Sequence, residues 1–137
     1  MLVFLDADVG MDFLARRKGF FDDAARLIEM GHAGKFSLCA SALSYSHWYY
    51  HLRKGIPQAE VVRILTGFKA IVRPVAVDDT VVSQALASGW PDFEDAVQHF
   101  AAFAHGADVI VTRNAPDFKR SKVKVMSPLA LLRALNT

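Results

Sequence analysis

The stretch PDFEDAVQHFAAFAHGADVIVTRNAPDF, residues 91–118, predicts one half of a parallel β-sheet unit. Acidic residues stand in front of a helical segment that a glycine ends, and an apolar strand follows from Ala107 to Thr112. This strand leads into a polar loop that contains Asn114 and Asp117. Because ligands of parallel sheets bind beyond the carboxyl ends of the strands, we expect this loop to lie at a functional site.

Alternating strands and helices are predicted on both sides of this stretch. Apolar runs indicate further strands at Leu2 to Leu5, Phe36 to Ala40, Ile71 to Val77 and Val123 to Met126. Helices are predicted between them, with caps or first residues at Asp8, Asp22 or Asp23, Ser41 or Ser44, Pro57, Asp78 or Asp79, and Ser127. The unbroken apolar run from Leu2 is typical of a central strand, whereas Pro74 suits an edge strand. The sequence therefore predicts an α/β protein with three α/β/α layers, a central parallel sheet of about five strands, and a single domain.

The composition is that of a folded protein with little net charge. Of the 137 residues, 53% are hydrophobic and 22% are charged, which excludes a disordered chain. The formal net charge of +2 is too small to indicate a nucleic-acid-binding protein by itself. The lone Cys39 excludes an internal disulfide and a multi-cysteine zinc site. The sequence has no basic leader and no apolar run of about 20 residues, so we expect a cytoplasmic protein without a membrane segment.

Acidic and amide side chains from both ends of the chain are expected to meet at one edge of the sheet. Asp6 ends the first strand, and Asn114 and Asp117 follow the strand that ends at Thr112. If these two strands are neighbours, their carboxyl ends share a crevice. A carboxylate that closes a buried strand has little local use, which favours a functional role for Asp6.

The helix that begins at Asp92 is expected to add further acids to this crevice. At about 100° per residue, its core face comprises Phe93, Ala96, Val97, Phe100, Phe103 and Ala104. One border of that face, which can look into the crevice, carries Asp92, Asp95 and His99. The residues expected to point away are Glu94, Gln98 and His105.

Clustered carboxylates favour a divalent metal ion. They repel one another and raise one another's pKa unless a cation joins them. Hard oxygen ligands suit Mg²⁺ or Mn²⁺, and such a site serves metal-assisted attack of water on a phosphate ester. A structural role is the alternative for Asp8, Asp12 and Asp92, which stand where helix caps and first-turn acids occur.

Three segments together resemble the PIN domain family. They are FLDADVGMDFLARR (residues 4–17), SALSYSHWYYHLRKG (residues 41–55) and DFEDAVQHFAAFAHGADVIVTRNAPDF (residues 92–118), the last followed by VMSP. The similarity covers nearly the whole chain and is closest to the compact bacterial branch related to VapC-type toxins. It implies a PIN-like fold and a metal-dependent ribonuclease that leaves a 5′-phosphate and a 3′-hydroxyl.

The resemblance assigns roles to particular residues. Asp6 matches the acid after the first strand, and Asp95 matches the acid of the helix before the fourth strand. Asp117 and Asn114 match the acid and the polar residue of the TRN-x-x-DF loop. These four are the implied catalytic residues, and the three aspartates would bind Mg²⁺ or Mn²⁺ with Asp92 as an additional ligand. The residues expected to line the pocket around them are Asp8, Ser44, His47, His99 and Thr112.

One position departs from the family pattern and motivates other functions. Many PIN domains carry a glutamate ligand in the helix after the second strand, where this chain has His47. The alternative is a PIN-fold module with weak or no activity that binds RNA or a protein partner. A phosphoacceptor receiver domain with Asp78 as its acceptor is a further alternative, although Pro74 and the TRN-x-x-DF loop do not fit that pattern.

The expected partners are an RNA substrate and other proteins. A basic cluster that follows Asp117 is the predicted contact for RNA phosphates and comprises Lys119, Arg120, Lys122 and Lys124. In a toxin-like protein, an antitoxin could cover the same surface. The resemblance alone implies a homodimer.

Overall fold

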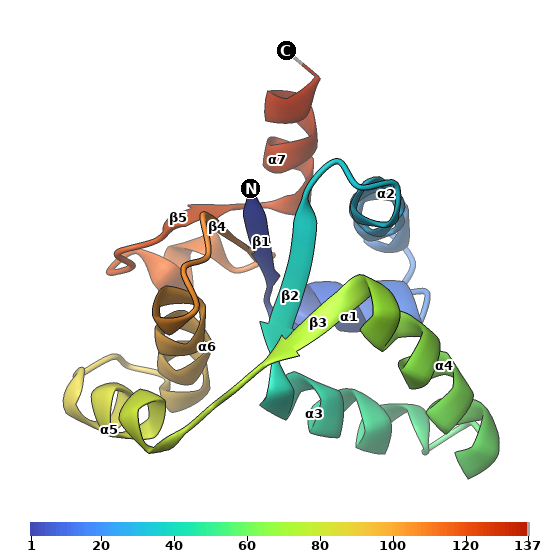
Figure 1. Ribbon diagram of the computed structural model, residues 1–137, viewed down its shortest axis with the longest axis horizontal. Coiled ribbons are helices and arrows are strands. Elements are labelled where there is room, and N and C mark those ends of the chain that lie inside the picture. Colours follow the sequence, from blue (N-terminus) through green and yellow to red (C-terminus); the bar gives the residue numbers. More distant parts are fainter. Residues whose placement is uncertain (137) are drawn as a thin grey trace.

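The computed structural model describes residues 1–136 and contains a five-stranded parallel sheet (Figure 1). Its strands are β1 (Leu2–Leu5), β2 (Ser37–Ser41), β3 (Val72–Val75), β4 (Val109–Val111) and β5 (Lys124–Met126). They are arranged in the order β3-β2-β1-β4-β5, and every neighbouring pair is parallel. The α/β class and the parallel sheet predicted from the sequence are confirmed.

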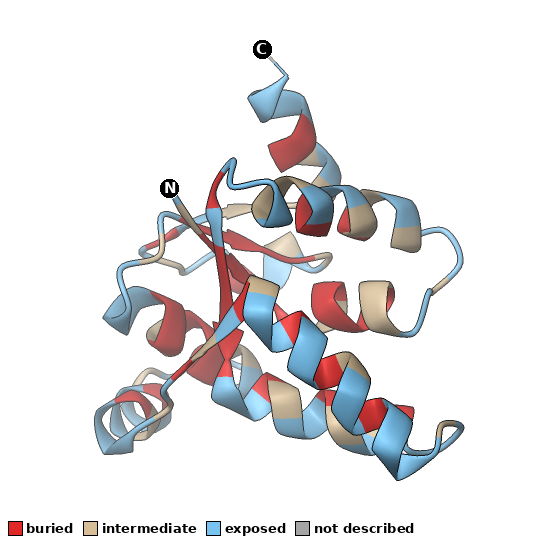
Figure 2. Ribbon diagram, turned by 45° about the vertical axis from the view of Figure 1, so that its right-hand side comes forward, coloured by how far each residue is buried: buried red, intermediate tan, exposed pale blue. Residues whose placement is uncertain are grey.

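Helices cover both faces of the sheet and complete the three layers (Figures 1 and 2). One face is covered by α1 (Ala7–Leu14), α2 (Phe21–His32), α3 (Ala42–Leu52), α4 (Gln58–Ile71) and α7 (Pro128–Leu135). The other is covered by α5 (Asp79–Ala87), α6 (Phe93–Ala104) and the 3-10 helix η1 (Ala115–Phe118). None of the helices within residues 1–136 combines the length and the apolar character that crossing a membrane requires.

β1 lies at the centre of the sheet because its side chains are apolar on both faces. Val3 and Leu5 pack into the core beneath α1 and α2, whereas Phe4 packs into the core beneath α6. All three side chains are fully buried. β3, which contains Pro74, forms an edge as predicted, since a proline has no N–H to offer a second neighbouring strand.

The order of the strands reverses at β1. β2 and β3 extend from one side of β1, while β4 and β5 extend from the other. β1 and β4 are paired directly, with Leu5 opposite Val111, so the chain leaves both strands at neighbouring points. Such a reversal is where parallel sheets open a crevice for ligands. The adjacency expected for the two strands that carry the candidate acids is therefore present.

The buried face of α6 agrees with the prediction only in part, since Ala96 and Val97 are buried as expected but two phenylalanines are not. Phe93 and Phe103, which the helical pattern places in the core, are 47% and 46% exposed. Small residues such as Ala101 lie against the sheet instead, and Gln98 and His99 are buried beside them. An alanine face lets the helix axis approach the sheet closely, and large rings then fit only at its margins. With the helix turned in this way, Gln98, which was expected to point away, and His99, which was expected at the border of the core face, are both buried.

α1 and α3 pack in very close contact through a glycine. A Cβ atom added to Gly10 would lie 2.2 Å from Cζ2 of Trp48, so no larger residue fits there without displacing the indole. The indole Nε1 of Trp48 donates to the carbonyl of Ala7 at 2.9 Å. These contacts hold the first turn of α1 beside α3, next to the carboxyl edge of β1.

Candidate active site

Asp6 is held in one orientation at the point where β1 ends. Its backbone N–H donates to the carbonyl of Val111 at 2.9 Å, which continues the pairing with β4. Its Oδ2 accepts a hydrogen bond of 2.7 Å from the hydroxyl of Thr112, and its Oδ1 accepts one of 2.8 Å from the N–H of Ala7. Asp6 and Thr112 are both buried. The carboxyl ends of β1 and β4 are thus joined through their side chains.

Asp6 also has a structural role, which corrects two expectations. The sequence pattern favours Asp8 as the cap of the first helix and gives Asp6 no local use. In the structure Asp6 is the N-cap of α1, and Asp8 lies within the first turn. Asp6 adopts the extended conformation of a cap because it ends a strand, so its carboxylate reaches the first N–H of the helix.

Asp8 reaches from α1 to the loop that follows β4. Its Oδ2 accepts hydrogen bonds from the backbone N–H of Arg113 at 3.3 Å and from Nδ2 of Asn114 at 3.1 Å. The N–H of Asn114 donates to Oγ1 of Thr112 at 3.0 Å. Oδ1 of Asp8 is buried and has no hydrogen-bond partner among residues 1–136. The loop therefore satisfies one oxygen of Asp8 and leaves the other for a ligand.

α6 and η1 bring further acids to the same edge. Asp92 is the N-cap of α6 and accepts a hydrogen bond of 2.9 Å from the N–H of Asp95, so its predicted capping alternative is realised. Burial, together with the negative charges of Asp92, Asp117, Asp8 and Glu94, raises the pKa of Asp95 to about 6. Asp117 is exposed and lies in η1.

The carboxylates near β1 also interact electrostatically. Burial and, to a smaller extent, the charges of Asp95 and Asp117 raise the pKa of Asp6 to about 6 despite its two hydrogen bonds. Burial raises the pKa of Asp8 to about 7, with the charge of Asp6 adding to the effect and Arg113 opposing it. Asp6, Asp8, Asp95 and Asp117 therefore form one electrostatic group, which we call the acid cluster.

The acid cluster suits a hard divalent cation by its chemistry. Its donors are carboxylate oxygens, which Mg²⁺ and Mn²⁺ prefer, and one buried oxygen of Asp8 has no partner in the described chain. The raised pKa values of Asp6, Asp8 and Asp95 also indicate that negative charge is poorly compensated there. Within residues 1–136, no group of three or more His, Cys, Asp or Glu side chains is already arranged as a metal site. The donor types fit such an ion, although the side chains are not drawn together around one point.

A buried ion pair borders the acid cluster. Asp12 is 1% exposed, and its Oδ2 lies 2.8 Å from Nε of Arg113. Nη2 of Arg113 donates to Oδ1 of Asp12 at 3.2 Å, and Arg17 lies 3.6 Å from the same oxygen. The Arg113 guanidinium also lies over the ring of Phe20, 3.9 Å from its centroid. Asp12 therefore anchors the loop after β4 and is not the capping or first-turn acid that its sequence position suggests.

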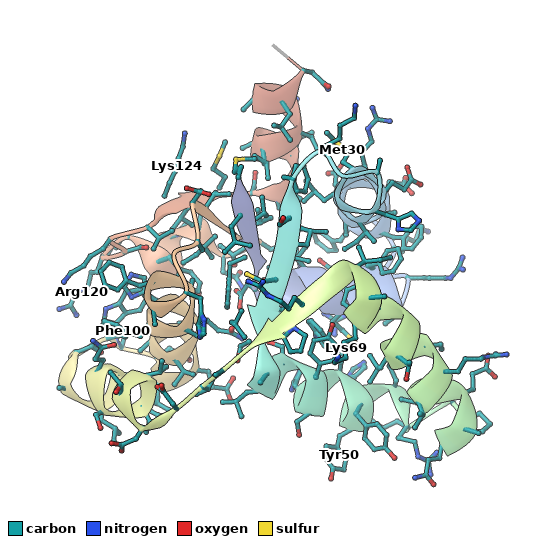
Figure 3. The ribbon with its side chains drawn as sticks, in the orientation of Figure 1. Met30, Tyr50, Lys69, Phe100, Arg120 and Lys124 are labelled. Carbon is teal, nitrogen blue, oxygen red and sulfur yellow. The ribbon has the colours of Figure 1, made fainter. Side chains whose placement is uncertain are left out.

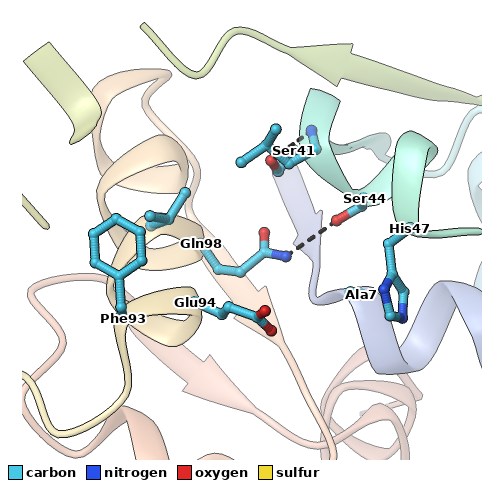
Figure 4. A pocket seen from close by; sticks show the side chains of 9 residues that line it. Ala7, Ser41, Ser44, His47, Phe93, Glu94 and Gln98 are labelled. Carbon is cyan, nitrogen blue, oxygen red and sulfur yellow. Dashed lines mark hydrogen bonds between the residues drawn. The ribbon is translucent and has the colours of Figure 1, made fainter. Parts of the chain in front are cut away.

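A cavity of about 310 Å³ opens beside the acid cluster, between α3 and α6 (Figure 4). Two of the expected pocket residues, Ser44 and His47, line it from α3, and Ala7 lines it from between Asp6 and Asp8. Glu94 and Gln98 line it from α6, although the helical pattern predicts that both point away. Figure 4 shows these two side chains extending from α6 toward Ser44 and His47. The prediction failed for these two residues because the alanines of α6, and not its phenylalanines, pack on the sheet, which directs Glu94 and Gln98 toward α3.

His99 lies outside this cavity, contrary to the expectation that it lines the pocket. Its ring stacks on Trp90 with centroids 4.7 Å apart, and its Nε2 accepts a hydrogen bond of 3.1 Å from the N–H of Lys122. Burial, together with the charge of Lys122, lowers the pKa of His99 to about 4. His99 therefore supports the loop before β5.

The four basic residues do not form a continuous rim around the acid cluster. Lys124 begins β5 opposite the start of β4, at the amino edge of the sheet, whereas the acids lie at the carboxyl edge. The Nζ of Lys122 lies over an aromatic ring of α6, 5.6 Å from its centroid. Arg120 donates to the carbonyl of Gly89 at 2.9 Å, and Figure 3 shows it reaching outward on the side of α6. Lys119, directly after η1, is the member of the set that follows the acid cluster most closely in the chain.

A model of the PIN domain family matches residues 2–115. The matched segment includes Asp6 and Asp95 and ends shortly before Asp117. A comparison with curated proteins gives no significant match.

Several solved structures share the fold. VapBC-1 from nontypeable Haemophilus influenzae is 14% identical, with a TM-score of 0.70 over 94% of this chain and 99% of that chain. FitAcB from Neisseria gonorrhoeae is also 14% identical, with a TM-score of 0.70 over 93% and 98%. VapBC2 from Rickettsia felis, bound to a DNA fragment from its promoter, is 13% identical, with a TM-score of 0.64 over 93% and 98%. At these identities the likeness shows a common fold and nothing about activity.

Proposed function

Because the chain belongs to the PIN domain family, we propose that it is a metal-dependent endoribonuclease. The acid cluster is the observation that carries this proposal. It lies at the carboxyl ends of two paired strands where the strand order reverses, and three of its members have raised pKa values. Such uncompensated charge lowers stability, so its presence at a crevice favours a site that receives a cation.

The proposed ligands of Mg²⁺ or Mn²⁺ are Asp6, Asp95 and Asp117, with Asp92 as an additional ligand. When bound, such an ion supplies a water of lowered pKa and stabilises the leaving oxygen of a phosphodiester. The protein positions the donors: Thr112 fixes Asp6 through its hydroxyl, and Asn114 ties its loop to Asp8. With pKa values of about 6, the carboxyls of Asp6 and Asp95 are mostly ionised at neutral pH, which is the form that binds a cation.

We also propose an antitoxin protein as the partner of this chain and a homodimer as its assembly. The resemblance to VapC-type toxins supports both, and the fold shared with the VapBC and FitAcB structures supports a protein partner. In this role the protein would act on cytoplasmic RNA. Copurification of the chain with the product of an adjacent reading frame, followed by measurement of the mass of the complex, tests the partner and the assembly.

The nuclease proposal is tested by cleavage of RNA in Mg²⁺ or Mn²⁺ and in EDTA. Cleavage should require the metal, and Asp117→Asn should lower the rate about 100-fold or more, since metal activation of water is worth several kcal/mol. Asp117 is the sharper choice because it is exposed, whereas Asp6→Asn also weakens the cap of α1. Asp22→Asn, at an exposed position on α2, is the matched control. Cleavage that persists in EDTA, or in both site variants, would sink this mechanism.

The second candidate is a PIN-fold module that binds RNA or a protein without cleaving. It is favoured by His47, which stands where many PIN domains have a glutamate, and by the lack of a preformed three-acid metal site in residues 1–136. A titration in which Mn²⁺ does not bind while RNA does would favour this function. Saturable Mn²⁺ binding that Asp117→Asn weakens would favour the nuclease.

A further inference from the structure

We propose that the cavity between α3 and α6 binds one nucleobase of the RNA strand and prefers guanine. The proposal rests on the nuclease function and adds a base-specific subsite beside the acid cluster. Ala7, which lines the cavity, stands between Asp6 and Asp8, and Glu94 directly precedes Asp95. A nucleotide whose phosphate lies at the acid cluster can therefore place its base in the cavity. With a volume of about 310 Å³, the cavity has room for a group of that kind.

A buried amide in the cavity has one polar atom left without a partner. Gln98 is 9% exposed, and its Nε2 donates to Oγ of Ser44 at 3.0 Å. Its Oε1 is buried and accepts no hydrogen bond from any residue in the range 1–136. Burying an acceptor in this state is unfavourable by about 1–3 kcal/mol, and most such groups in folded proteins are satisfied. A ligand in the cavity that donates to this oxygen, after a small turn of the Gln98 amide, would remove this cost.

The rest of the lining suits the flat apolar face of a base. Phe93 lies at the cavity and is 47% exposed, which is unusual for a phenylalanine in the first turn of a helix that packs on a sheet. Leu43 and Val97 add apolar surface from α3 and α6. Bases stack on exposed aromatic rings in proteins that bind single-stranded RNA, and this stacking is tolerant of sequence. Phe93 therefore provides affinity, while the polar groups provide selectivity.

The charge of the lining excludes an anionic ligand. Glu94 contributes a negative charge to the wall of the cavity. Among residues 1–136, no lysine or arginine lines the cavity. The acid cluster next to it adds further negative potential, which a metal ion would offset at the cluster and not in the cavity. A phosphate would be repelled, whereas a base is neutral and has polar edges.

The polar groups of the cavity select guanine among the bases. The acceptors without a partner in the described chain are Oε1 of Gln98 and the carboxylate of Glu94, on two side chains that extend from α6 toward α3 (Figure 4). Guanine presents two adjacent donors on its Watson–Crick edge, the ring N1–H and the exocyclic N2 amine. Adenine and cytosine have one donor group there, and uracil has a single N–H between two acceptors. The two oxygens of the Glu94 carboxylate have the spacing to accept from both of these donors, so guanine suits this group better than the other bases do, and Oε1 of Gln98 adds a further acceptor to the same wall.

Neutral nucleosides are the appropriate probes because they lack a phosphate, which the carboxylates of the acid cluster repel when no metal ion is bound. Guanosine, inosine, adenosine, cytidine and uridine are titrated separately into the full-length protein in EDTA and followed by ¹H–¹⁵N NMR. Guanosine should shift the side-chain amide of Gln98 and backbone amides at the start of α3 and α6. Inosine, which lacks the N2 amine, should bind about tenfold more weakly than guanosine, as expected for one hydrogen bond to a charged acceptor.

Three substitutions divide the contributions of the cavity wall. Glu94→Gln and Gln98→Met should each weaken guanosine binding about tenfold, and Glu94→Gln should also remove the preference over inosine. Phe93→Ala should weaken binding of every nucleoside by about the same factor. The matched controls are Glu29→Gln and Gln84→Met on exposed positions of other helices, and Phe103→Ala, which is 46% exposed at the far end of α6. These three controls should leave binding unchanged.

The outcomes separate this inference from the nuclease proposal. Guanosine binding at the cavity by a protein that never cleaves RNA would support the subsite and overturn the nuclease. Equal binding of all five nucleosides, a preference for uridine or adenosine, no binding, or shifts confined to residues outside the cavity would overturn the subsite. Because Gln98 is buried and its substitution can destabilise the fold, the exposed Glu94 provides the decisive variant: guanosine affinity unchanged in Glu94→Gln overturns the proposed guanine contact.

Discussion

Asp8 and Asp12 lie one turn apart on α1, but only Asp12 forms ion pairs with basic side chains of the described chain. Asp12 is the more deeply buried, and Arg113 and Arg17 lie 2.8 Å and 3.6 Å from its oxygens. Arg113 donates a hydrogen bond to Asp8 only from its backbone N–H, its charge acts on Asp8 without an ion pair, and Oδ1 of Asp8 has no hydrogen-bond partner within residues 1–136. Burial raises the pKa of Asp8 to about 7. The burial of an acid therefore does not mark the candidate site; the absence of a direct ion pair does.

This contrast also assigns the two acids to different functions. A buried carboxylate without a cation is strongly unfavourable, whereas a paired one is close to neutral in its effect on stability. The pair of Asp12 and Arg113 thus serves the fold by anchoring the loop after β4. Asp8 faces the same loop from the first turn of α1, where a bound cation would supply the positive charge that its carboxylate lacks. The following predictions test this division, from the largest expected effect to the smallest.

Removing the guanidinium that pairs with Asp12 should have the largest effect on stability. Arg113→Met leaves a carboxylate of 1% exposure without its nearest partner and also removes the guanidinium from the ring of Phe20. We expect the free energy of unfolding, measured with urea, to fall by about 3–5 kcal/mol. Adding Asp12→Asn to this variant should restore at least about half of the loss, since no buried charge then remains.

The control for this prediction is an exposed ion pair elsewhere in the fold. Arg63 lies 3.0 Å from Glu60 on α4, and both side chains are largely exposed, at 77% and 49%. Arg63→Met should change the free energy of unfolding by less than about 1 kcal/mol. If Arg113→Met has an effect as small as Arg63→Met, the ion pair does not anchor the loop and the comparison fails.

The acids that follow strands could be predicted from the sequence. Apolar runs end abruptly at Asp6 and before Asn114, and parallel topology brings the ends of neighbouring strands to one edge. Those positions need no knowledge of side-chain packing. The ion pair of Asp12 and Arg113 could not be predicted in this way, because the two residues are 101 positions apart and nothing in either local pattern refers to the other.

The orientation of α6 shows a second limit of the sequence pattern. Hydrophobicity favours its phenylalanines as the core face, but close packing on the sheet selects the alanines. Gln98 and His99 can then be buried because each has a partner from a distant segment, Ser44 on α3 and the N–H of Lys122. A periodicity argument carries no information about such partners. The cavity wall formed by Gln98 was therefore beyond prediction, whereas the acid edge was not.

The comparison of the buried acids Asp8 and Asp12 can be extended to a buried basic group, His99. It is buried, its Nδ1 has no hydrogen-bond partner in the described part of the chain, and the nearby charge of Lys122 repels its protonated form. Burial and this repulsion lower its pKa from 6.5 to about 4. Above pH 6.5 the ring is neutral in both states, but as the pH falls toward 4 the unfolded state takes up the proton first. The free energy of unfolding should therefore fall by about 2 kcal/mol across this window on account of His99.

The contribution of His99 can be isolated by a variant that keeps an aromatic ring stacked on Trp90. In His99→Phe the stability should differ from the wild type by a constant amount above pH 6.5, and the variant should then gain relative to the wild type between pH 6.5 and 4. Exposed His32 provides the control, because His32→Gln should give a curve parallel to the wild type. Thermal melts at intervals of pH measure all three, and parallel curves for His99→Phe and the wild type would contradict the prediction.

The smallest expected effect separates Asp8 and Asp12 most directly, because the same substitution should act with opposite sign on the two acids. In the metal-free protein the pKa of Asp8 is raised from 3.8 to about 7, so its ionisation opposes folding. Asp8→Asn should raise the free energy of unfolding by about 1 kcal/mol above pH 7, after allowance for partial exposure, and the gain should vanish below about pH 4. Asp12→Asn should lower it instead, because the half-buried guanidinium of Arg113 loses its countercharge. Urea unfolding in EDTA at pH 4 and pH 8 measures both effects. If both substitutions lower the free energy of unfolding at pH 8, the protein itself stabilises the ionised carboxylate of Asp8, and the acid cluster does not need a cation.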